Sequence, residues 1–254
     1  MKGEKWEKWE KIWKTAWRAG KIVFEFLLDT IAPPNPEVRK IERMSPEIFM
    51  EKAMQGEKLE DSPGVLHLLP YRSAVVKTAI IEIKTHENRK IACLLATLLY
   101  DFLLSELPDL EMFRNFTRPL VIPIPITRKK ERERGWNQCN FLAQAMKKID
   151  GGKKTGKANK TFEIRTDILR KIRENGDQVG RGRAARFKNL ENCFSVRTVR
   201  NGILTPGKTA KTAILGRNII VFDDIVTTGA TLASARRTLL SAGAKQVISV
   251  ALAH

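Results

Sequence analysis

The stretch "NIIVFDDIVTTGATL", residues 218–232, combines residue types that could do chemistry together. Its apolar run predicts a buried strand, and the run ends in two adjacent carboxylates, Asp223 and Asp224. The following "TTGAT" predicts a turn into a helix, whose first backbone amides have no partner within the helix and carry partial positive charge. Small residues let an anion approach those amides, and threonine hydroxyls add donors. The turn is therefore predicted to bind a phosphate.

Carboxylates beside a phosphate site would repel a second phosphate, so they need a different partner. Sugar hydroxyls, or a metal ion bridging to them, meet that need. The acidic pair ends its strand, and ligands of open α/β sheets bind outside the carboxyl ends of the strands. The stretch therefore predicts a site for a ribose phosphate. The predicted phosphate-binding residues are Thr227, Thr228, Gly229, Ala230 and Thr231.

Strands and helices alternate on both sides of this site. The apolar run "PLVIPIPIT" (119–127) is typical of a strand buried on both faces. A charged loop, "RKKERERG", is expected after it, followed by a helix over about 137–149. After the acidic pair we expect a helix over about 231–242, Gly243 as its stop, and a last strand "QVISVALA". This alternation predicts an α/β domain with a mainly parallel sheet.

Two further strands, "TDILRKI" and "CFSVRTV", are expected on either side of a loop rich in glycine and arginine, residues 174–189. On the N-terminal side, residues 71–107 predict two helices broken near residues 85–88, and residues 33–70 predict an irregular or partly helical linker. We therefore divide the chain into an N-terminal region, 1–70, and a domain, 71–254.

The N-terminal region begins with a predicted helix over residues 4–19, in which glutamates precede lysines by four positions. Four tryptophans lie on one stripe of this helix: Trp6, Trp9, Trp13 and Trp17. Such a stripe fits packing on the protein body, a membrane surface or a partner protein, and the residues alone leave these alternatives open.

The charge balance is unusual for a chain of 254 residues, because 46 lysines and arginines against 28 acids give a net charge of +18. Much of the excess lies in residues 128–188, where 19 basic residues face 7 acidic ones. Such a field attracts polyanions, either nucleic acid or a phosphorylated small molecule, although a solvated basic surface also explains it. Weak nucleic-acid binding through 128–188 is therefore a hypothesis.

Cysteine usage and hydropathy indicate a reducing compartment. The three cysteines, Cys93, Cys139 and Cys193, form no CxxC pair and suggest neither a disulfide framework nor a zinc site. Glu25 and Asp29 interrupt the early apolar run, so we expect no signal peptide and no membrane span. The predicted location is the cytoplasm, and the sequence leaves the oligomeric state open.

The motifs resemble a known family. "IIVFDDIVTTGAT" is similar to the phosphoribosyl-pyrophosphate signature of type I phosphoribosyltransferases. "PIPITRKKERERGWNQ", "DQVGRGRAARFKNLENCFSV" and "YRSAVVKTAIIEIK", the last ending in Lys84, resemble segments of the ComF-type competence branch. The resemblance covers roughly residues 71–254. Members usually carry a four-cysteine zinc finger near the N-terminus, whereas this chain has no cysteine before Cys93.

The resemblance implies the type I phosphoribosyltransferase fold, a mainly parallel twisted sheet flanked by helices, here with an N-terminal helical extension. It also implies that phosphoribosyl pyrophosphate binds with Mg²⁺, with Asp223 and Asp224 on the ribose hydroxyls. No residue of the chain is predicted to bind a metal ion directly. The implied catalytic residues are Asp223, Asp224, Arg134, Gln178 and Arg186, and the implied pyrophosphate loop is Ile126, Thr127, Arg128 and Lys129.

Two functions of different class follow. The first is a phosphoribosyltransferase that transfers the phosphoribosyl group to an acceptor which the sequence does not identify. The second is a non-catalytic, nucleic-acid-associated protein of DNA uptake that retains the phosphate site.

Overall fold

A computed structural model describes residues 35–59, 62–152, 161–173, 193–197 and 213–254. The chain forms two compact units, residues 1–40 and 41–254. In the first, the described residues hold most of the short helix α2 (Pro36–Ile41), where Lys40 pairs with Glu37. The second unit carries the sheet and the site.

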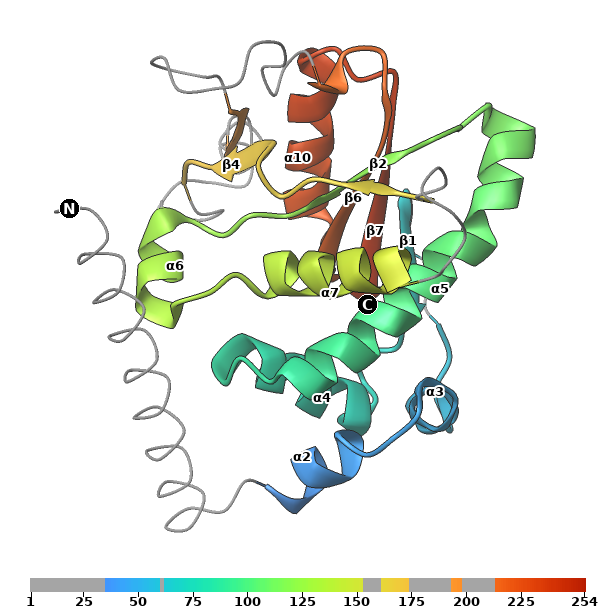
Figure 1. The fold of residues 1–254 in the computed structure, drawn as a ribbon, viewed down its shortest axis with the longest axis vertical. Coiled ribbons are helices and arrows are strands. Elements are labelled where there is room, and N and C mark those ends of the chain that lie inside the picture. Colours follow the sequence, from blue (N-terminus) through green and yellow to red (C-terminus); the bar gives the residue numbers. More distant parts are fainter. Residues whose placement is uncertain (1–34, 60–61, 153–160, 174–192, 198–212) are drawn as a thin grey trace, which may run out of the picture. The chain divides into compact units, whose positions relative to one another are not determined.

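The second unit is built on a five-stranded, fully parallel sheet with the strand order β1-β7-β6-β2-β3 (Figure 1). The strands are β1 (Val65–Leu69), β2 (Leu120–Pro123), β3 (Glu163–Ile164), β6 (Asn218–Ile225) and β7 (Gln246–Ala253). A second, two-stranded antiparallel sheet pairs β4 (Leu169–Lys171) with β5 (Phe194–Val196). The α/β fold class with a mainly parallel sheet is confirmed.

Helices cover both faces of the large sheet. Helix α10 (Ala230–Ser241) buries Leu232, Ala235 and Leu239 in one core with side chains of β2, β6 and β7. Helix α7 (Gln138–Gly152) packs against β2 and β6 and against the long helix α5 (Arg89–Arg114). The remaining helices of this unit in the described residues are α3 (Pro46–Met54), α4 (Ala74–Thr85) and α6 (Arg128–Arg134).

Strands β2, β6 and β7 lie where the apolar runs predict them, and the four residues of β2 are all buried. The predicted break between two helices is also confirmed. Asn88 begins α5, because its side-chain oxygen accepts from the backbone N–H of Ile91 at 3.2 Å. Gly243 follows α10 with a φ of +101°, a backbone conformation that residues other than glycine rarely adopt.

The predicted charged loop "RKKERERG", residues 128–135, is wrong, because residues 128–134 form helix α6. Arginine, lysine and glutamate are all good helix formers. The Thr127 hydroxyl accepts from the backbone N–H of Lys130 at the start, and Gly135 ends the helix with a φ of +85°. High charge density does not by itself mark a loop, and here the end signals and the helix propensities favour a helix.

The predicted linker over residues 33–70 needs a correction as well. It contains α3, in keeping with a partly helical segment, but it also contains β1, which pairs in parallel with β7. The sequence of β1, "VLHLL", is a short apolar run between Gly64 and Pro70, a pattern that is consistent with a strand, and its pairing with β7 shows that it is one. The N-terminal tryptophan helix and the loop 174–189 lie outside the described residues.

Helix α5 is long and apolar enough to cross a bilayer by length and composition alone, a test that core helices of soluble proteins also pass. Many of its apolar side chains, among them Leu95, Leu99 and Tyr100, are buried within the fold. The absence of a membrane span stays a prediction.

Candidate functional site

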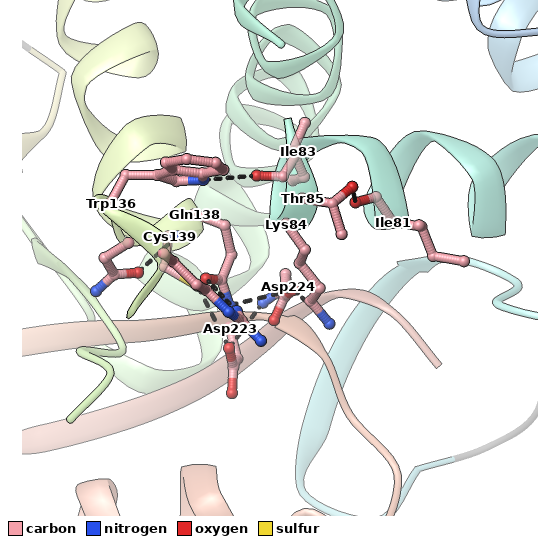
Figure 2. A network of polar contacts seen from close by, with 11 residues as sticks. Ile81, Ile83, Lys84, Thr85, Trp136, Gln138, Cys139, Asp223 and Asp224 are labelled. Atoms are coloured by element: carbon pink, nitrogen blue, oxygen red, sulfur yellow. Dashed lines mark hydrogen bonds and ion pairs between the residues drawn. The ribbon is translucent and has the colours of Figure 1, made fainter. Parts of the chain in front are cut away.

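The acidic pair lies near the carboxyl end of β6, and Figure 2 shows both side chains close to Gln138 and Cys139 of α7. Asp224 is 4% exposed, and Asp223 is partly buried. One carboxylate oxygen of Asp223, Oδ1, accepts from the backbone N–H of Asp224 at 2.9 Å and from the thiol of Cys139 at 3.3 Å. The two carboxylates are therefore held side by side at the edge of the sheet where ligands of α/β folds bind.

Burial and the neighbouring charge of Asp224 raise the pKa of Asp223 well above its ordinary value. Burial, together with the charges of Asp223 and Asp224, also raises the pKa of the Cys139 thiol well above its ordinary value. A thiol held neutral is a poor nucleophile. Cys139 therefore acts in this site as a hydrogen-bond donor to Asp223.

Cationic and amide side chains from α4 and α7 contact Asp224, and one from α6 contacts the amide. Its Oδ2 accepts the ammonium of Lys84, the second-last residue of α4, at 2.8 Å and the side-chain amide of Gln138 at 3.4 Å. The guanidinium of Arg134 donates in turn to the Gln138 oxygen at 3.4 Å. The structure thus brings the predicted Arg134 next to the acidic pair through Gln138.

The segment between α6 and α7 fixes these side chains. Trp136 donates its ring N–H to the backbone oxygen of Ile83 at 3.0 Å, which ties the end of α4 to this segment (Figure 2). Asn137 is buried, donates to the backbone oxygen of Ile124 at 3.2 Å, and accepts from the backbone N–H of Cys139 at 2.9 Å. The loop after β2 is thereby held close to the start of α7.

Three residues of this cluster were not predicted as site residues: Lys84, Gln138 and Cys139. Gln138 ends the motif "RGWNQ", and Lys84 ends a segment that resembles the family. Their positions in these motifs are the sequence signal that could have marked both as site residues. The proximity of Cys139 to the carboxylates has no sequence signal.

The predicted phosphate cradle forms the turn between β6 and α10. Gly229 begins α10 with a φ of +70°, and a Cβ on it would lie 3.8 Å from a methyl group of Val65. Thr227 and Thr228 are exposed, and the Thr228 hydroxyl accepts from the backbone N–H of Ala230 at 3.5 Å. The predicted strand, turn and helix are all present, and the phosphate-binding role of the five residues stays a prediction.

The predicted pyrophosphate loop connects β2 to α6. Because β2 and β6 are neighbouring parallel strands, this loop lies at the same edge of the sheet as the acidic pair. Ile126 is partly buried, Thr127 is the buried cap of α6, and Arg128 and Lys129 are exposed on its first turn. The predicted catalytic residues Gln178 and Arg186 lie outside the described residues.

The donor set is suited to Mg²⁺ held together with a ligand. One potential ligand atom each from Cys139, Asp223 and Asp224 lies within 4.8 Å of the others. Mg²⁺ takes oxygen ligands, and it is commonly bound by one or two carboxylates plus phosphate oxygens of a substrate and water. The two carboxylates fit this pattern, whereas a neutral thiol does not.

Comparisons with known proteins agree with this geometry. Residues 141–254 match the family model of the phosphoribosyl transferase domain. Competence protein F of Haemophilus influenzae is 23% identical over 128 residues, which are 50% of this chain and 46% of that protein. Competence protein ComFC of Bacillus subtilis is 25% identical over 137 residues, which are 51% of this chain and 42% of that protein. The chain thus spans less than half the length of these relatives.

The parallel sheet, the acidic pair and the matched model define a phosphoribosyltransferase-like domain. Both relatives carry the name competence protein, so the chain is similar to competence proteins that share this phosphoribosyltransferase-like domain.

Proposed function

We propose that the protein binds phosphoribosyl pyrophosphate together with Mg²⁺ and transfers its phosphoribosyl group to an acceptor. The observation that carries the proposal is the end of β6, where two adjacent carboxylates precede a helix that starts at a glycine with a positive φ. Carboxylates accept hydrogen bonds from vicinal ribose hydroxyls, and the backbone amides at the start of α10 suit a 5′-phosphate.

Phosphoribosyl transfer breaks the bond from the anomeric carbon to pyrophosphate and develops positive charge on the sugar. The chain needs no covalent nucleophile for this step; it must orient the sugar and stabilise the leaving group. Asp223 and Asp224 would orient the ribose, and Arg128, Lys129 and Arg134 would provide positive charge near the leaving pyrophosphate. Bound Mg²⁺ would neutralise charge on the pyrophosphate oxygens.

The test is titration of phosphoribosyl pyrophosphate into wild-type protein by calorimetry, with and without Mg²⁺, followed by a screen for released pyrophosphate with bases and amines as acceptors. We expect saturable binding that requires Mg²⁺, and acceptor-dependent pyrophosphate release. No binding in either condition would reject the proposal. If the protein binds phosphoribosyl pyrophosphate but releases no pyrophosphate with any acceptor, the binding function stands and the transferase activity is rejected.

A second candidate function is nucleic-acid association in DNA uptake. Two observations favour it. The proteins similar to this chain carry the name competence protein. Helix α6 also presents exposed basic side chains, among them Arg128, Lys129 and Arg132, on the segment that follows β2. In this alternative the phosphate site is retained without turnover, and the basic segment 128–188 contacts phosphates rather than bases.

If this segment binds nucleic acid, we expect weak binding that is insensitive to sequence and falls steeply with salt. The logarithm of affinity should fall linearly with the logarithm of salt concentration, by about 0.7 per phosphate contact on single strands. Fluorescence anisotropy with single- and double-stranded DNA at several salt concentrations measures the slope. A variant with Arg128, Lys129 and Arg132 changed to glutamine should reduce the slope, and binding that persists unchanged in that variant would exclude α6 as the surface.

A further inference from the structure

Lys84 places a cation on one of the two carboxylates of the site. Its ammonium lies 2.8 Å from Oδ2 of Asp224, and the side chains are 26% and 5% exposed, respectively. The same Oδ2 also accepts from Gln138. The oxygen of Asp224 that faces this cluster therefore already has two donors.

The position of Lys84 is fixed by its neighbours in the chain. The backbone oxygen of the preceding residue, Ile83, accepts from the ring N–H of Trp136, and Thr85 donates its hydroxyl to the backbone oxygen of Ile81 (Figure 2). The last turn of α4 thus has one side-chain hydrogen bond within the helix and one to the segment that supplies Gln138. The ion pair is part of a network that connects α4 to the segment before α7.

A positive charge at this position opposes the approach of a second cation to Asp224. Two like charges a few ångströms apart in a partly buried site repel each other far more strongly than in bulk water. A free divalent cation would have to displace the ammonium from a buried carboxylate and leave it without a partner, which is costly. A cation that arrives with an anionic ligand brings oxygens that can accept the displaced ammonium.

We propose that Lys84 reserves Asp224 for a metal carried by an anionic ligand, and that it screens the acidic pair from free divalent cations. The inference rests on the proposed function for the identity of that ligand. Lys84 acts through Asp224 and is therefore a positioning residue, which sets the order of binding: the metal enters with the phosphorylated ligand.

The test measures binding of Mn²⁺ alone, by electron paramagnetic resonance, to wild type and three variants. Lys84→Met removes the charge at similar length, Lys84→Arg keeps it, and Lys77→Met removes an exposed lysine from the same helix as the matched control. Removing the opposing charge should tighten Mn²⁺ binding at least about tenfold in Lys84→Met. Lys84→Arg and Lys77→Met should stay within about twofold of wild type, since both keep a positively charged side chain at position 84 beside Asp224.

The gain must come from the acidic pair, so adding Asp224→Asn to Lys84→Met should abolish it. Equal Mn²⁺ affinity in wild type and Lys84→Met, with both folded by circular dichroism, would overturn the inference. The same holds if the gain persists in the double variant.

A measurement on the wild-type protein covers the case in which Lys84→Met fails to fold. Acetylation of Lys84 by a water-soluble acylating reagent, followed by mass spectrometry, reports whether its amine is held by Asp224. Millimolar Mg²⁺ alone should leave the labelling rate of Lys84 unchanged relative to that of Lys77. A faster rate with Mg²⁺ alone means that the free cation displaces the ammonium, which would overturn the inference.

These outcomes are independent of the proposed function. If wild type binds no phosphoribosyl pyrophosphate while Lys84→Met gains Mn²⁺ affinity, the proposed ligand is wrong and the screening role of Lys84 stands. If wild type binds the ligand but Lys84→Met gains nothing, the proposed function stands and the screening role is wrong.

Discussion

The variant Asp223→Ala/Asp224→Ala is expected to lose at least about a hundredfold in affinity for phosphoribosyl pyrophosphate with Mg²⁺. Hydrogen bonds to charged groups contribute about 1.5–3 kcal/mol each, and two of them would be removed from the ribose hydroxyls. A hundredfold change corresponds to about 2.7 kcal/mol, so the expectation is a lower bound. Calorimetry of wild type and variant under identical conditions measures the difference.

The control must remove two negative charges elsewhere, because net charge alone changes the affinity for an anionic ligand. Glu51→Ala/Glu111→Ala does this at exposed positions of α3 and α5. This control should bind like wild type. The double alanine variant leaves Lys84 without its partner, so its fold is checked by circular dichroism, and the isosteric Asp223→Asn/Asp224→Asn variant is measured beside it. Unchanged affinity in a folded variant would remove the acidic pair from the ligand site.

Asp223→Asn is expected to be more stable than wild type near neutral pH. The pKa of Asp223 in the folded protein is raised by burial and by the charge of Asp224, above an unfolded value of about 3.9. Between these two pKa values the folded state binds more protons than the unfolded state, so stability falls as pH rises through this window. Above the folded pKa the cost of ionising Asp223 is fully present in wild type and absent in the asparagine variant.

The expected gain near neutral pH is about 0.5–2 kcal/mol, the usual size of a single stabilising substitution. It should shrink toward zero as the pH falls below the unfolded pKa of about 3.9, because wild type is then protonated in both states. Thermal unfolding of both proteins from about pH 3 to pH 8 measures the difference.

Asp167→Asn provides a control of opposite sign. A hydrogen bond from Arg165 lowers the pKa of Asp167, so its contribution to stability is present above its unfolded pKa and is lost as pH falls. This variant should be less stable than wild type near neutral pH and similar to it in acid. An Asp223→Asn difference that stays constant with pH would show that Asp223 does not titrate as described.

The local pattern of the chain determined the core of the candidate site. The apolar run before Asp223, the pair of acids and the glycine turn before α10 are contiguous, so period, composition and turn chemistry were sufficient to predict a strand, an acidic end and a helix start. The parallel sheet followed from the alternation of strands and helices, since parallel neighbours require a crossover between them. Helix α6 carries the same kind of signal, because Thr127 and Gly135 mark its two ends although its charge density is high.

Only the tertiary structure decided which distant side chains meet the acidic pair. Gln138 reaches Asp224 across 86 positions of the chain, and Lys84 approaches the same oxygen from a third element, α4. No periodicity encodes such contacts, because they depend on how α4, α7 and β6 pack in three dimensions. The same holds for the choice of β7 as the partner of β1, because the two strands are far apart in the chain. The raised pKa of Asp223 is likewise a property of burial and neighbours, which two adjacent aspartates in a sequence do not specify.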